Sequence, residues 1–375
     1  MKKIWTILIL GIVLRIFLSL STYHTDMEAF NLGGKVIASG NILNLYDYSS
    51  NLAVFNYPPL IYWFHGIFHF LLGNILSVNL LVKLPYLIFD LSIGLLLLRW
   101  FEIKSKALVA FTIWMFNPIS LYATYMMGQF DIIPTFFTIL SLYSISKDRL
   151  QLAALALGGA IAFKIYPVFL LLPLILLGKN NIEKFKIFIL ALLPYSISII
   201  PYLPWHSFRS NALFATQNSK SLYANIAVSG GETILLFPLS LLIFYLFLFS
   251  KSKNLSVWKI YLMPLLLFFI FTHYHPQWLI WITPFLIISL TIQSKNIPPV
   301  LLMLFSWFGL LFFFDSSLTV NMFAPIFPSL ANLPSIWKLL NIDVDYNLSR
   351  SLLQTIFAAS AFYFIYDNFQ AKSNG

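Results

Sequence analysis

Residues 1–30 read MKKIWTILILGIVLRIFLSLSTYHTDMEAF, and this stretch decides what kind of fold to expect. After two lysines, the apolar run from Ile4 to Leu20 is long enough to cross a bilayer as a helix. No small-residue cleavage site separates it from polar Tyr23, so we interpret it as an uncleaved first span and not as a signal peptide. Asp26 and Glu28 then stand where the chain should leave the membrane.

The composition of the 375-residue chain indicates a polytopic membrane protein. It is 59% hydrophobic and only 10% charged, whereas a soluble domain carries about 25% charged residues. There is no cysteine, which excludes a disulfide framework and a thiol nucleophile. The net charge of +10 comes from basic residues spread between apolar segments, so we expect no nucleic-acid partner.

Apolar stretches near the length needed to cross a bilayer, about 17–25 residues, recur along the chain. We therefore predict an all-α fold, a single polytopic helical domain over residues 1–375 with about twelve spans. The expected spans are 4–21, 80–98, 107–124, 132–146, 150–163, 167–178, 185–204, 233–250, 258–272, 277–292, 298–314 and 351–367.

The distribution of lysine and arginine orients these spans. With a cytoplasmic N-terminus, 15 of the 23 basic residues fall in cytoplasmic segments, as the positive-inside rule requires. The outer side then holds the loops 22–79, 205–232 and 315–350. The 15 residues are Lys2, Lys3, Arg99, Lys104, Lys106, Lys147, Arg149, Lys179, Lys184, Lys186, Lys251, Lys253, Lys259, Lys295 and Lys372.

The segment 58–73, PPLIYWFHGIFHFLLG, is apolar enough to suggest a further helix. If it crossed the membrane, every later span would invert and the basic stretch 99–106 would face outward. It has only 16 residues and begins with paired prolines, so we predict a helix lying in the outer interface. An ordinary short span is the alternative.

Five outer segments bring carboxylates, cations and amides to one membrane level. Ionisable groups at that level are costly and usually serve a site. The groups are Asp26 and Glu28 in the first loop, Gln129 and Asp131 in MGQFDII, Lys164 in AFKIYP, His206, Arg209 and Lys220 in the loop 205–232, and His273, His275 and Gln277 in FTHYHPQW.

These residues also have structural interpretations. Asp26 and Asp131 could each cap a helix that starts at the next residue. Lys164 could snorkel to the headgroups, and the aromatic residues around His273 fit an interfacial belt. None of these interpretations explains why all the groups share one side of the membrane.

The residue types suit transfer from a lipid phosphate. Asp26 can take a proton from a hydroxyl nucleophile, and Lys164 with His273 or His275 can stabilise an anionic leaving group. The sequence has no Gly-rich phosphate loop, so we expect a lipid-linked donor and not a nucleotide. Asp26, Glu28 and Asp131 could bind a divalent cation, Mg or Mn, through their oxygens.

Several motifs follow Asp26-x-Glu28 in a set order: ASGNILNLYDY (38–48), NYPPLIYW (56–63), LPYLIFD (84–90), MGQFDIIPTFF (127–137), AFKIYP (162–167) and HYHPQWLIWITPF (273–285). This order resembles the GT-C membrane glycosyltransferases, especially bacterial members and relatives of the dolichyl-phosphate-sugar-dependent mannosyl- and glucosyltransferases. The likeness covers residues 1–290 and rests on the order of short motifs.

The resemblance implies a GT-C helical bundle with an in-plane helix in its first outer loop. It implies that Asp26 is the catalytic base, with Glu28 at a second acidic position. The loop has no Asp-x-Asp, so the resemblance does not by itself imply a metal. The other matched positions are Gln129 and Asp131 in the second outer loop, Lys164 after the fifth span, and His273 or His275 after a late span.

We therefore expect a multi-pass enzyme of a bacterial-type plasma membrane with an extracytoplasmic active site. It would transfer a mannose-like or glucose-like hexose, with inversion, from a polyprenyl-phosphate donor to a hydroxyl of a glycan or lipid acceptor. Arg209 and Gln277 are expected to bind substrate. The alternatives are a lipid-linked sugar flippase, which would usually show repeats and midplane polar groups, and a non-catalytic membrane subunit.

Overall fold

The protein is described by a computed structural model that covers residues 2–50, 53–251 and 255–370; Lys253 and Lys372 of the orientation argument lie outside these residues. The described chain is mainly helical, with one antiparallel ribbon in which β1 (Asn225–Ala227) pairs with β2 (Thr233–Leu235). The α-helices are α1 (Lys2–Ser21), α2 (Met27–Ala38), α3 (Leu60–Leu72), α4 (Val78–Lys83), α5 (Leu87–Trp100), α6 (Lys104–Phe116), α7 (Pro118–Ser120), α8 (Ile132–Ile145), α9 (Leu150–Phe163), α10 (Leu171–Leu176), α11 (Asn181–Ile199), α12 (His206–Phe208), α13 (Leu236–Lys251), α14 (Val257–Phe271), α15 (Thr283–Ile292), α16 (Ile297–Leu311), α17 (Ile336–Leu339) and α18 (Tyr346–Gln370).

The all-α prediction is confirmed, and each predicted span contains helical structure, although residues 233–235 of the span 233–250 form β2. Six helical segments of the described chain are long and apolar enough to cross a membrane, and seven shorter apolar helices there have 10–17 residues. The figure of about twelve spans is therefore approximate. The six segments are Lys2–Ser21, Val78–Trp100, Lys104–Met126, Asn181–Tyr202, Ser294–Leu311 and Tyr346–Phe369.

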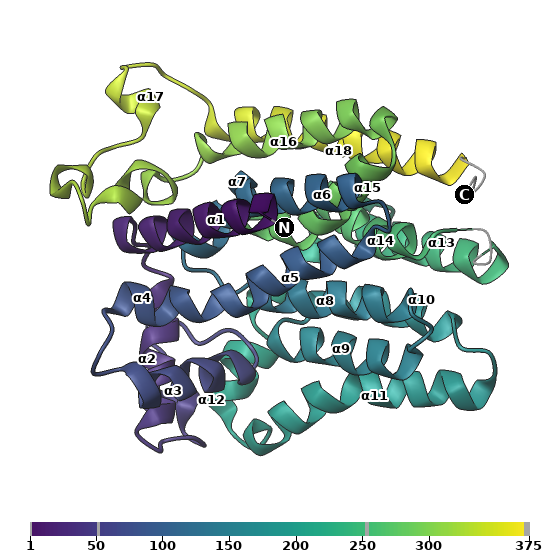
Figure 1. Cartoon of the computed structure of the whole chain (residues 1–375), viewed down its shortest axis with the longest axis horizontal. Coiled ribbons are helices and arrows are strands. Elements are labelled where there is room, and N and C mark those ends of the chain that lie inside the picture. The colour runs from purple at the N-terminus through teal and green to yellow at the C-terminus, as the bar shows by residue number, and fades with distance from the viewer. Residues whose placement is uncertain (1, 51–52, 252–254, 371–375) are drawn as a thin grey trace.

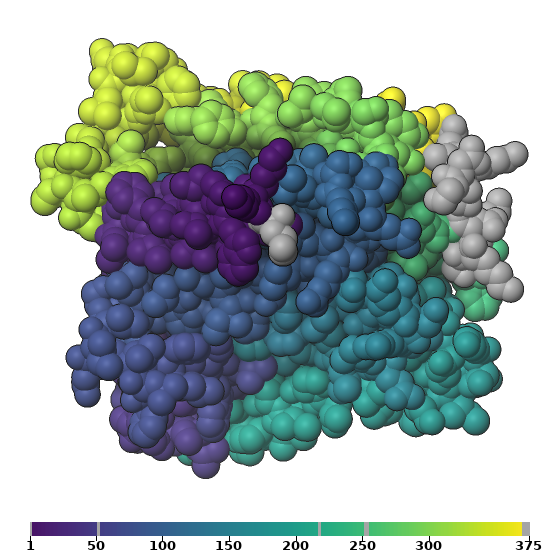
Figure 2. All heavy atoms as spheres, in the orientation of Figure 1, coloured from purple at the N-terminus to yellow at the C-terminus, as the bar shows by residue number. Residues whose placement is uncertain are grey.

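The long helices run side by side along one direction, so Figure 1 views the bundle from its side. Helices α2, α3, α12 and α17 gather at one end, on the left of this view, which we call the loop-rich end. In Figure 2 the segment that contains α17 projects beyond the rest of the molecule at this end.

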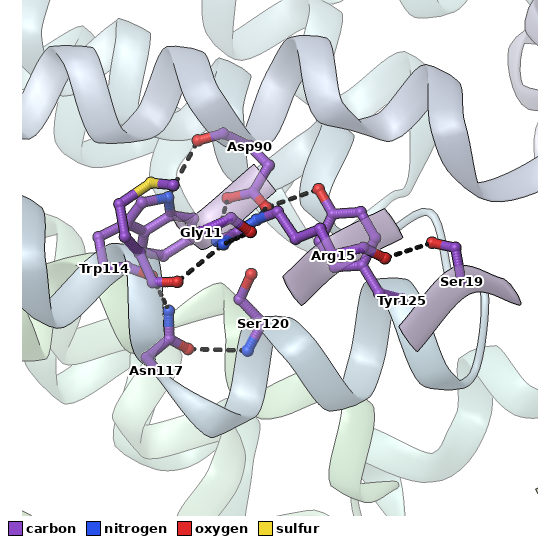
Figure 3. Close-up of polar contacts among 9 residues, drawn as sticks. Gly11, Arg15, Ser19, Asp90, Trp114, Asn117, Ser120 and Tyr125 are labelled. Atoms are coloured by element: carbon purple, nitrogen blue, oxygen red, sulfur yellow. Dashed lines mark hydrogen bonds and ion pairs between the residues drawn. The ribbon is translucent and has the colours of Figure 1, made fainter. Parts of the chain in front are cut away.

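A buried ion pair ties α1 to its neighbours (Figure 3). Arg15 on α1 and Asp90 on α5 are both 0% exposed, and Arg15 Nε lies 2.6 Å from Asp90 Oδ2. Arg15 Nη1 also donates to the carbonyls of Gly11 and Met115, at 3.0 and 2.7 Å. The Tyr125 hydroxyl donates to Asp90 at 2.6 Å. Since both charges are paired and hydrogen-bonded, this network can hold α1 in place inside the bundle.

Helices α2 and α3 form a hairpin that covers the loop-rich end. They approach closely because glycine occupies the contact: a Cβ added at Gly33 would lie 2.3 Å from the Tyr62 ring. One face of α3 is buried, whereas Ile67, Phe70 and Leu71 on the other face are 56–78% exposed. Large apolar side chains on an exposed face suit a helix lying in a membrane interface. That location for residues 58–73 stays a prediction.

Candidate functional site

Asp26 lies between α1 and α2, and its side chain points to another part of the chain. Although Asp26 precedes α2, its carboxylate makes no capping hydrogen bond within the described residues. Asp26 Oδ2 instead accepts a hydrogen bond from Gln129 Nε2 at 2.5 Å. The carboxylate remains 46% exposed. The helix-capping interpretation therefore does not account for Asp26.

The backbone before α8 is shaped to deliver Gln129 to Asp26. A π-helical turn, Leu121–Met126, is followed by Gly128 with a φ of +72°. L-residues rarely adopt this conformation, and a Cβ at Gly128 would also lie 2.7 Å from Met27 Sδ. Glycine at 128 thus lets the chain turn tightly against the start of α2.

His24 is a neutral neighbour of Asp26. Burial lowers the pKa of His24 more strongly than the Asp26 charge raises it. Its Nδ1 accepts the backbone N–H of Asp26 at 3.2 Å, so the proton of the neutral ring is on Nε2. The 3.6 Å separation between His24 Nδ1 and Asp26 Oδ2 is consequently not a hydrogen bond. Among the described residues, the Asp26 carboxylate therefore has no bonded cation.

Asp131 and Lys164 form a second buried ion pair, at the start of α8 and after the end of α9. Lys164 Nζ donates to Asp131 Oδ1 at 2.7 Å, and Trp281 Nε1 donates to the same oxygen at 2.5 Å. The other oxygen, Oδ2, is buried and has no hydrogen-bond partner among the described residues. The side chain of Asp131 makes no capping bond there either. Asp131 therefore serves the pair and not the helix end.

Aromatic rings surround the Lys164 ammonium. Its Nζ lies 5.2–5.4 Å from the centroids of four rings, within the range of cation–π attraction. Lys164 is 7% exposed, so its ammonium does not reach the surface as a snorkelling lysine would. The four rings belong to Tyr57, Phe130, Trp278 and Trp281.

A second cation, Lys220, lies beside His275. Lys220 Nζ is 2.9 Å from His275 Nε2. Burial, and next the Lys220 charge, lower the pKa of His275 to about 3, so the ring is neutral near pH 7 and accepts from the ammonium. Burial and then repulsion by Lys164 lower the pKa of Lys220 itself. No carboxylate of the described residues lies within ion-pair distance of Lys220.

Two cavities meet at these groups. The polar cavity, about 360 Å³, is lined by Asp26, Gln129, Lys220, His275 and Gln277 among others. The apolar cavity, about 390 Å³, contains Lys164 and Lys220 and is otherwise lined mainly by aromatic and aliphatic side chains from the α9–α10 turn, α11 and α14. Both cavities contact Asn56, Tyr57, Lys220 and Trp278.

The structure places four predicted site residues outside the lining of these two cavities, and one of them, Asp131, is bonded to Lys164 of the apolar cavity. Glu28 hydrogen-bonds the hydroxyl of Tyr23 and does not line either cavity. Arg209 donates to nearby backbone carbonyls at 2.7 Å in an exposed loop. His273 lines a different cavity, between α14 and α18.

Some residues that line the cavities were not predicted as site residues. Lys220 was noted only as a basic residue of the loop 205–232, and its position in an outer loop was the available signal. The aromatic residues Tyr57, Trp278 and Trp281 had no such signal. Aromatic residues are abundant in this chain, at 18%, and the interfacial belt already explained them.

The three carboxylates proposed as cation ligands do not come together. Asp26 pairs with Gln129, Glu28 with Tyr23, and Asp131 with Lys164. Within residues 2–50, 53–251 and 255–370, no group of three or more His, Cys, Asp or Glu side chains is arranged to hold a metal ion. The side chains do not fit a resident Mg or Mn ion, and we derive no step through one.

A solved structure shares this architecture. The crystal structure of ArnT from Cupriavidus metallidurans bound to undecaprenyl phosphate aligns with 96% of this chain and 75% of that chain, with a TM-score of 0.53 and 12% sequence identity. The chain has the GT-C fold. The predicted GT-C architecture is thereby confirmed, and with it an integral membrane protein.

Sequence comparisons identify further proteins that are similar to this chain. Residues 124–215, which include Gln129, Asp131 and Lys164, match the family described as mannosyltransferase (PIG-M). Over 105 residues the chain is 31% identical to GPI mannosyltransferase 1 of Kluyveromyces lactis, covering 26% of each protein. Over 193 residues it is 27% identical to GPI mannosyltransferase 1 of Dictyostelium discoideum, covering 47% of this chain and 41% of that protein. The chain thus spans well under half the length of these relatives.

Proposed function

We propose that this chain is an inverting membrane glycosyltransferase. It transfers a hexose, most simply mannose, from a polyprenyl-phosphate donor to a hydroxyl group of a glycan or lipid acceptor. The family match, the names of the curated relatives and the undecaprenyl phosphate bound to ArnT support a lipid-linked donor and mannose. The observation that carries the proposal is the meeting of an apolar cavity with a polar, carboxylate-lined cavity at Lys220.

Each cavity suits one part of such a donor. The aromatic and aliphatic lining of the apolar cavity, which includes Phe169 and Phe268, can hold the first isoprene units. The phosphate then lies near Lys164 and Lys220, where the two cavities meet. The sugar extends into the polar cavity, where Gln129, Gln277 and Asn56 supply amides for its hydroxyl groups.

Asp26 is suited to act as general base. Gln129 holds one carboxylate oxygen at 2.5 Å, and the partly exposed carboxylate faces the polar cavity. The acceptor hydroxyl gives its proton to Asp26 as its oxygen attacks the anomeric carbon. The bond between that carbon and the phosphate oxygen breaks, and its electron pair leaves with polyprenyl phosphate. A single displacement of this kind inverts the anomeric configuration.

Lys220 and Lys164 stabilise the leaving phosphate. The negative charge on the phosphate increases as the glycosidic bond breaks, so cations beside it favour the transition state over the bound donor. Among the described residues Lys220 contacts the neutral rings of His275 and Trp278 and no carboxylate, whereas Lys164 shares its charge with Asp131. Lys220 therefore contributes more to stabilising the leaving phosphate, and Lys164 lines the apolar cavity beside it.

The test of the function is transfer by purified protein with a polyprenyl-phosphate-mannose donor. Asp26→Asn keeps the shape of the side chain and its contact with Gln129 but cannot take a proton. We expect transfer to fall by about 10²–10⁴-fold while donor binding and thermal stability are retained. Glu28→Gln, the same change at a carboxylate outside the cavities, is the matched control and should transfer normally. Near-normal transfer by stable Asp26→Asn protein would return Asp26 to a structural role.

The side of the membrane is tested by labelling. The chain has no cysteine, so Ser77→Cys, in the exposed turn between α3 and α4, introduces a single thiol. We expect an impermeant thiol reagent to label it in intact cells, because the loop-rich end faces out of the cytoplasm. Ser105→Cys, beside two lysines at the start of α6, should be labelled only after permeabilisation. The reverse pattern would overturn both the topology and the extracytoplasmic site.

A further inference from the structure

Lys83, the last residue of α4, is a buried lysine without an acidic partner. It is 0% exposed, and no carboxylate of the described residues lies within ion-pair distance of its ammonium. A buried charge that is not paired with an opposite charge is costly, and in a membrane protein such a group usually serves a site. Lys83 lines neither the polar nor the apolar cavity, so it is not placed to bind a substrate directly.

The Lys83 ammonium bonds the end of α1. It donates to the Thr22 carbonyl at 2.6 Å and to the Ser19 carbonyl at 3.4 Å. The last carbonyl groups of a helix have no partner within the helix and carry its partial negative charge, so a cation suits them. Asp26 follows Thr22 by four residues. Lys83 therefore fixes the point from which the chain reaches Asp26.

The Thr22 hydroxyl joins this point to the π-helical turn Leu121–Met126. Thr22 is 0% exposed, and its Oγ1 accepts from the Lys83 ammonium at 3.2 Å. The hydroxyl has one proton to donate, so it can bond its own helix or the turn, and the ammonium remains its donor in either case. The carbonyl oxygens within its reach are those of Leu18 at 2.7 Å, Met126 at 3.1 Å and Tyr125 at 3.2 Å.

The hydrocarbon part of Lys83 lies beside the turn that carries Gln129. A Cβ added at Gly128 would be 3.4 Å from Lys83 Cε, so the lysine stem lies next to the backbone just before Gln129. Gln129 is 1% exposed, and its Nε2 donates to Asp26 Oδ2 at 2.5 Å. Lys83 is thus placed on both sides of this hydrogen bond, four residues before Asp26 and one residue before Gln129.

We propose that Lys83 is a positioning residue that holds the Asp26 carboxylate and the Gln129 amide together. Asp26 takes the acceptor proton in the proposed function, on which this inference rests. Without the ammonium, the end of α1 and the π-helical turn lose their common donor, and Asp26 can shift away from Gln129. A small misplacement of a reacting group slows a reaction strongly. The two cavities are lined by other residues, so donor binding should remain.

Steady-state transfer by purified Lys83→Met protein tests this role. Methionine keeps an unbranched apolar side chain and removes the ammonium. We expect turnover per donor-binding site to fall by about 10–10²-fold, with KM for polyprenyl-phosphate mannose unchanged. Unchanged turnover in folded Lys83→Met protein would overturn the proposal.

Lys259→Met is the matched control. Lys259 on α14 is 6% exposed and donates to the Asn368 carbonyl at 3.0 Å, and it lines neither cavity. This variant also removes a buried ammonium from a backbone carbonyl, and we expect normal turnover per donor-binding site. An equal loss of turnover in Lys259→Met and Lys83→Met would overturn the proposal, because general damage to the fold would then explain both.

A double-mutant cycle with Gln129→Met shows whether Lys83 acts through the contact between Gln129 and Asp26. If it does, Lys83→Met/Gln129→Met should be slowed much less than the product of the two single reductions, because both changes break the same contact. A reduction equal to that product would overturn the proposal, since the two side chains would then act independently.

A second variant covers the case in which Lys83→Met does not fold. Thr22→Val keeps the shape of the side chain and removes the hydroxyl, and we expect several-fold lower turnover with unchanged KM for the donor; unchanged turnover would overturn the proposal in that case. Impaired transfer by Asp26→Asn with normal turnover by Lys83→Met would overturn the role of Lys83 alone. Normal transfer by Asp26→Asn would overturn the proposed base itself, so the two failures are distinguishable.

Discussion

Two ion pairs are buried in this protein, Arg15–Asp90 and Lys164–Asp131, and they differ in what surrounds them. In the first pair the guanidinium bonds the carboxylate and two carbonyl groups, and Tyr125 adds a further donor to Asp90 (Figure 3). None of the side-chain polar atoms of these three residues is left unpaired. We call this pair closed, because all of its polar side-chain atoms have partners within the protein.

The second pair is open on one side. Asp131 Oδ1 accepts two hydrogen bonds, but Asp131 Oδ2 has no partner among the described residues. Lys164 borders the apolar cavity and has aromatic rings, not carbonyl groups, around the rest of its ammonium.

The difference shows that burial and charge alone do not mark a functional site. A buried ion pair needs further hydrogen bonds to offset the loss of water, and a closed pair has them all within the protein. A pair whose cation borders a cavity, as Lys164 does, is arranged for a ligand. The comparison makes three predictions, and the first has the largest expected effect.

Breaking the closed pair should destabilise the fold. Arg15→Met leaves the Asp90 charge buried without its cation, and we expect a loss of about 3–5 kcal/mol in the free energy of unfolding. Thermal unfolding in detergent measures this loss. The double variant Arg15→Met/Asp90→Asn carries no uncompensated charge and should recover most of the stability and full transfer. A single variant as stable as the unsubstituted protein would contradict the structural role of this pair.

Neutralising the open pair should instead remove function. Lys164→Met/Asp131→Asn also carries no uncompensated charge, so we expect a folded protein with transfer reduced by about 10²-fold, as for loss of one electrostatic contact to the transition state. The single change Lys164→Ala should affect KM and turnover for the donor more than for the acceptor. If Lys164→Ala leaves both donor parameters unchanged, Lys164 has no part in donor binding.

The smallest expected effect is on the pH dependence of KM for the donor, and it concerns Lys220. Because burial and Lys164 lower the pKa of Lys220, its ammonium loses its proton at a lower pH than an ordinary lysine. A bound phosphate favours the charged form, so KM for the donor should rise as pH rises through this lowered pKa, by about tenfold per pH unit at most. Lys220→Arg stays charged at every accessible pH and should abolish the rise. A rise that persists in Lys220→Arg would assign the titration to another group.

Much of the fold follows from the sequence. The lengths and composition of the apolar stretches predict a multi-span helical protein, because a helix needs about 17–25 mostly apolar residues to cross a bilayer. The sequence likewise predicted where the first span ends and that the carboxylate of Asp26 follows it. Those features are local in sequence, and the order of the motifs was enough to indicate the GT-C fold.

Which polar residues contact one another, and which line a cavity, could be learned only from the tertiary structure. Asp26 and Gln129 are 103 positions apart in the chain, and Asp131 and Trp281 are 150 apart, so no local pattern reports their contacts. The same packing turns Glu28 toward Tyr23, leaves Arg209 against its own backbone, and divides His273 from His275 between two cavities. Sequence shows which charged groups reach one end of the bundle, because that depends on the spacing of apolar segments. Only packing decides which of them are closed pairs and which face a cavity, because hydrogen bonds depend on distances of a few tenths of an ångström that helix order alone does not set.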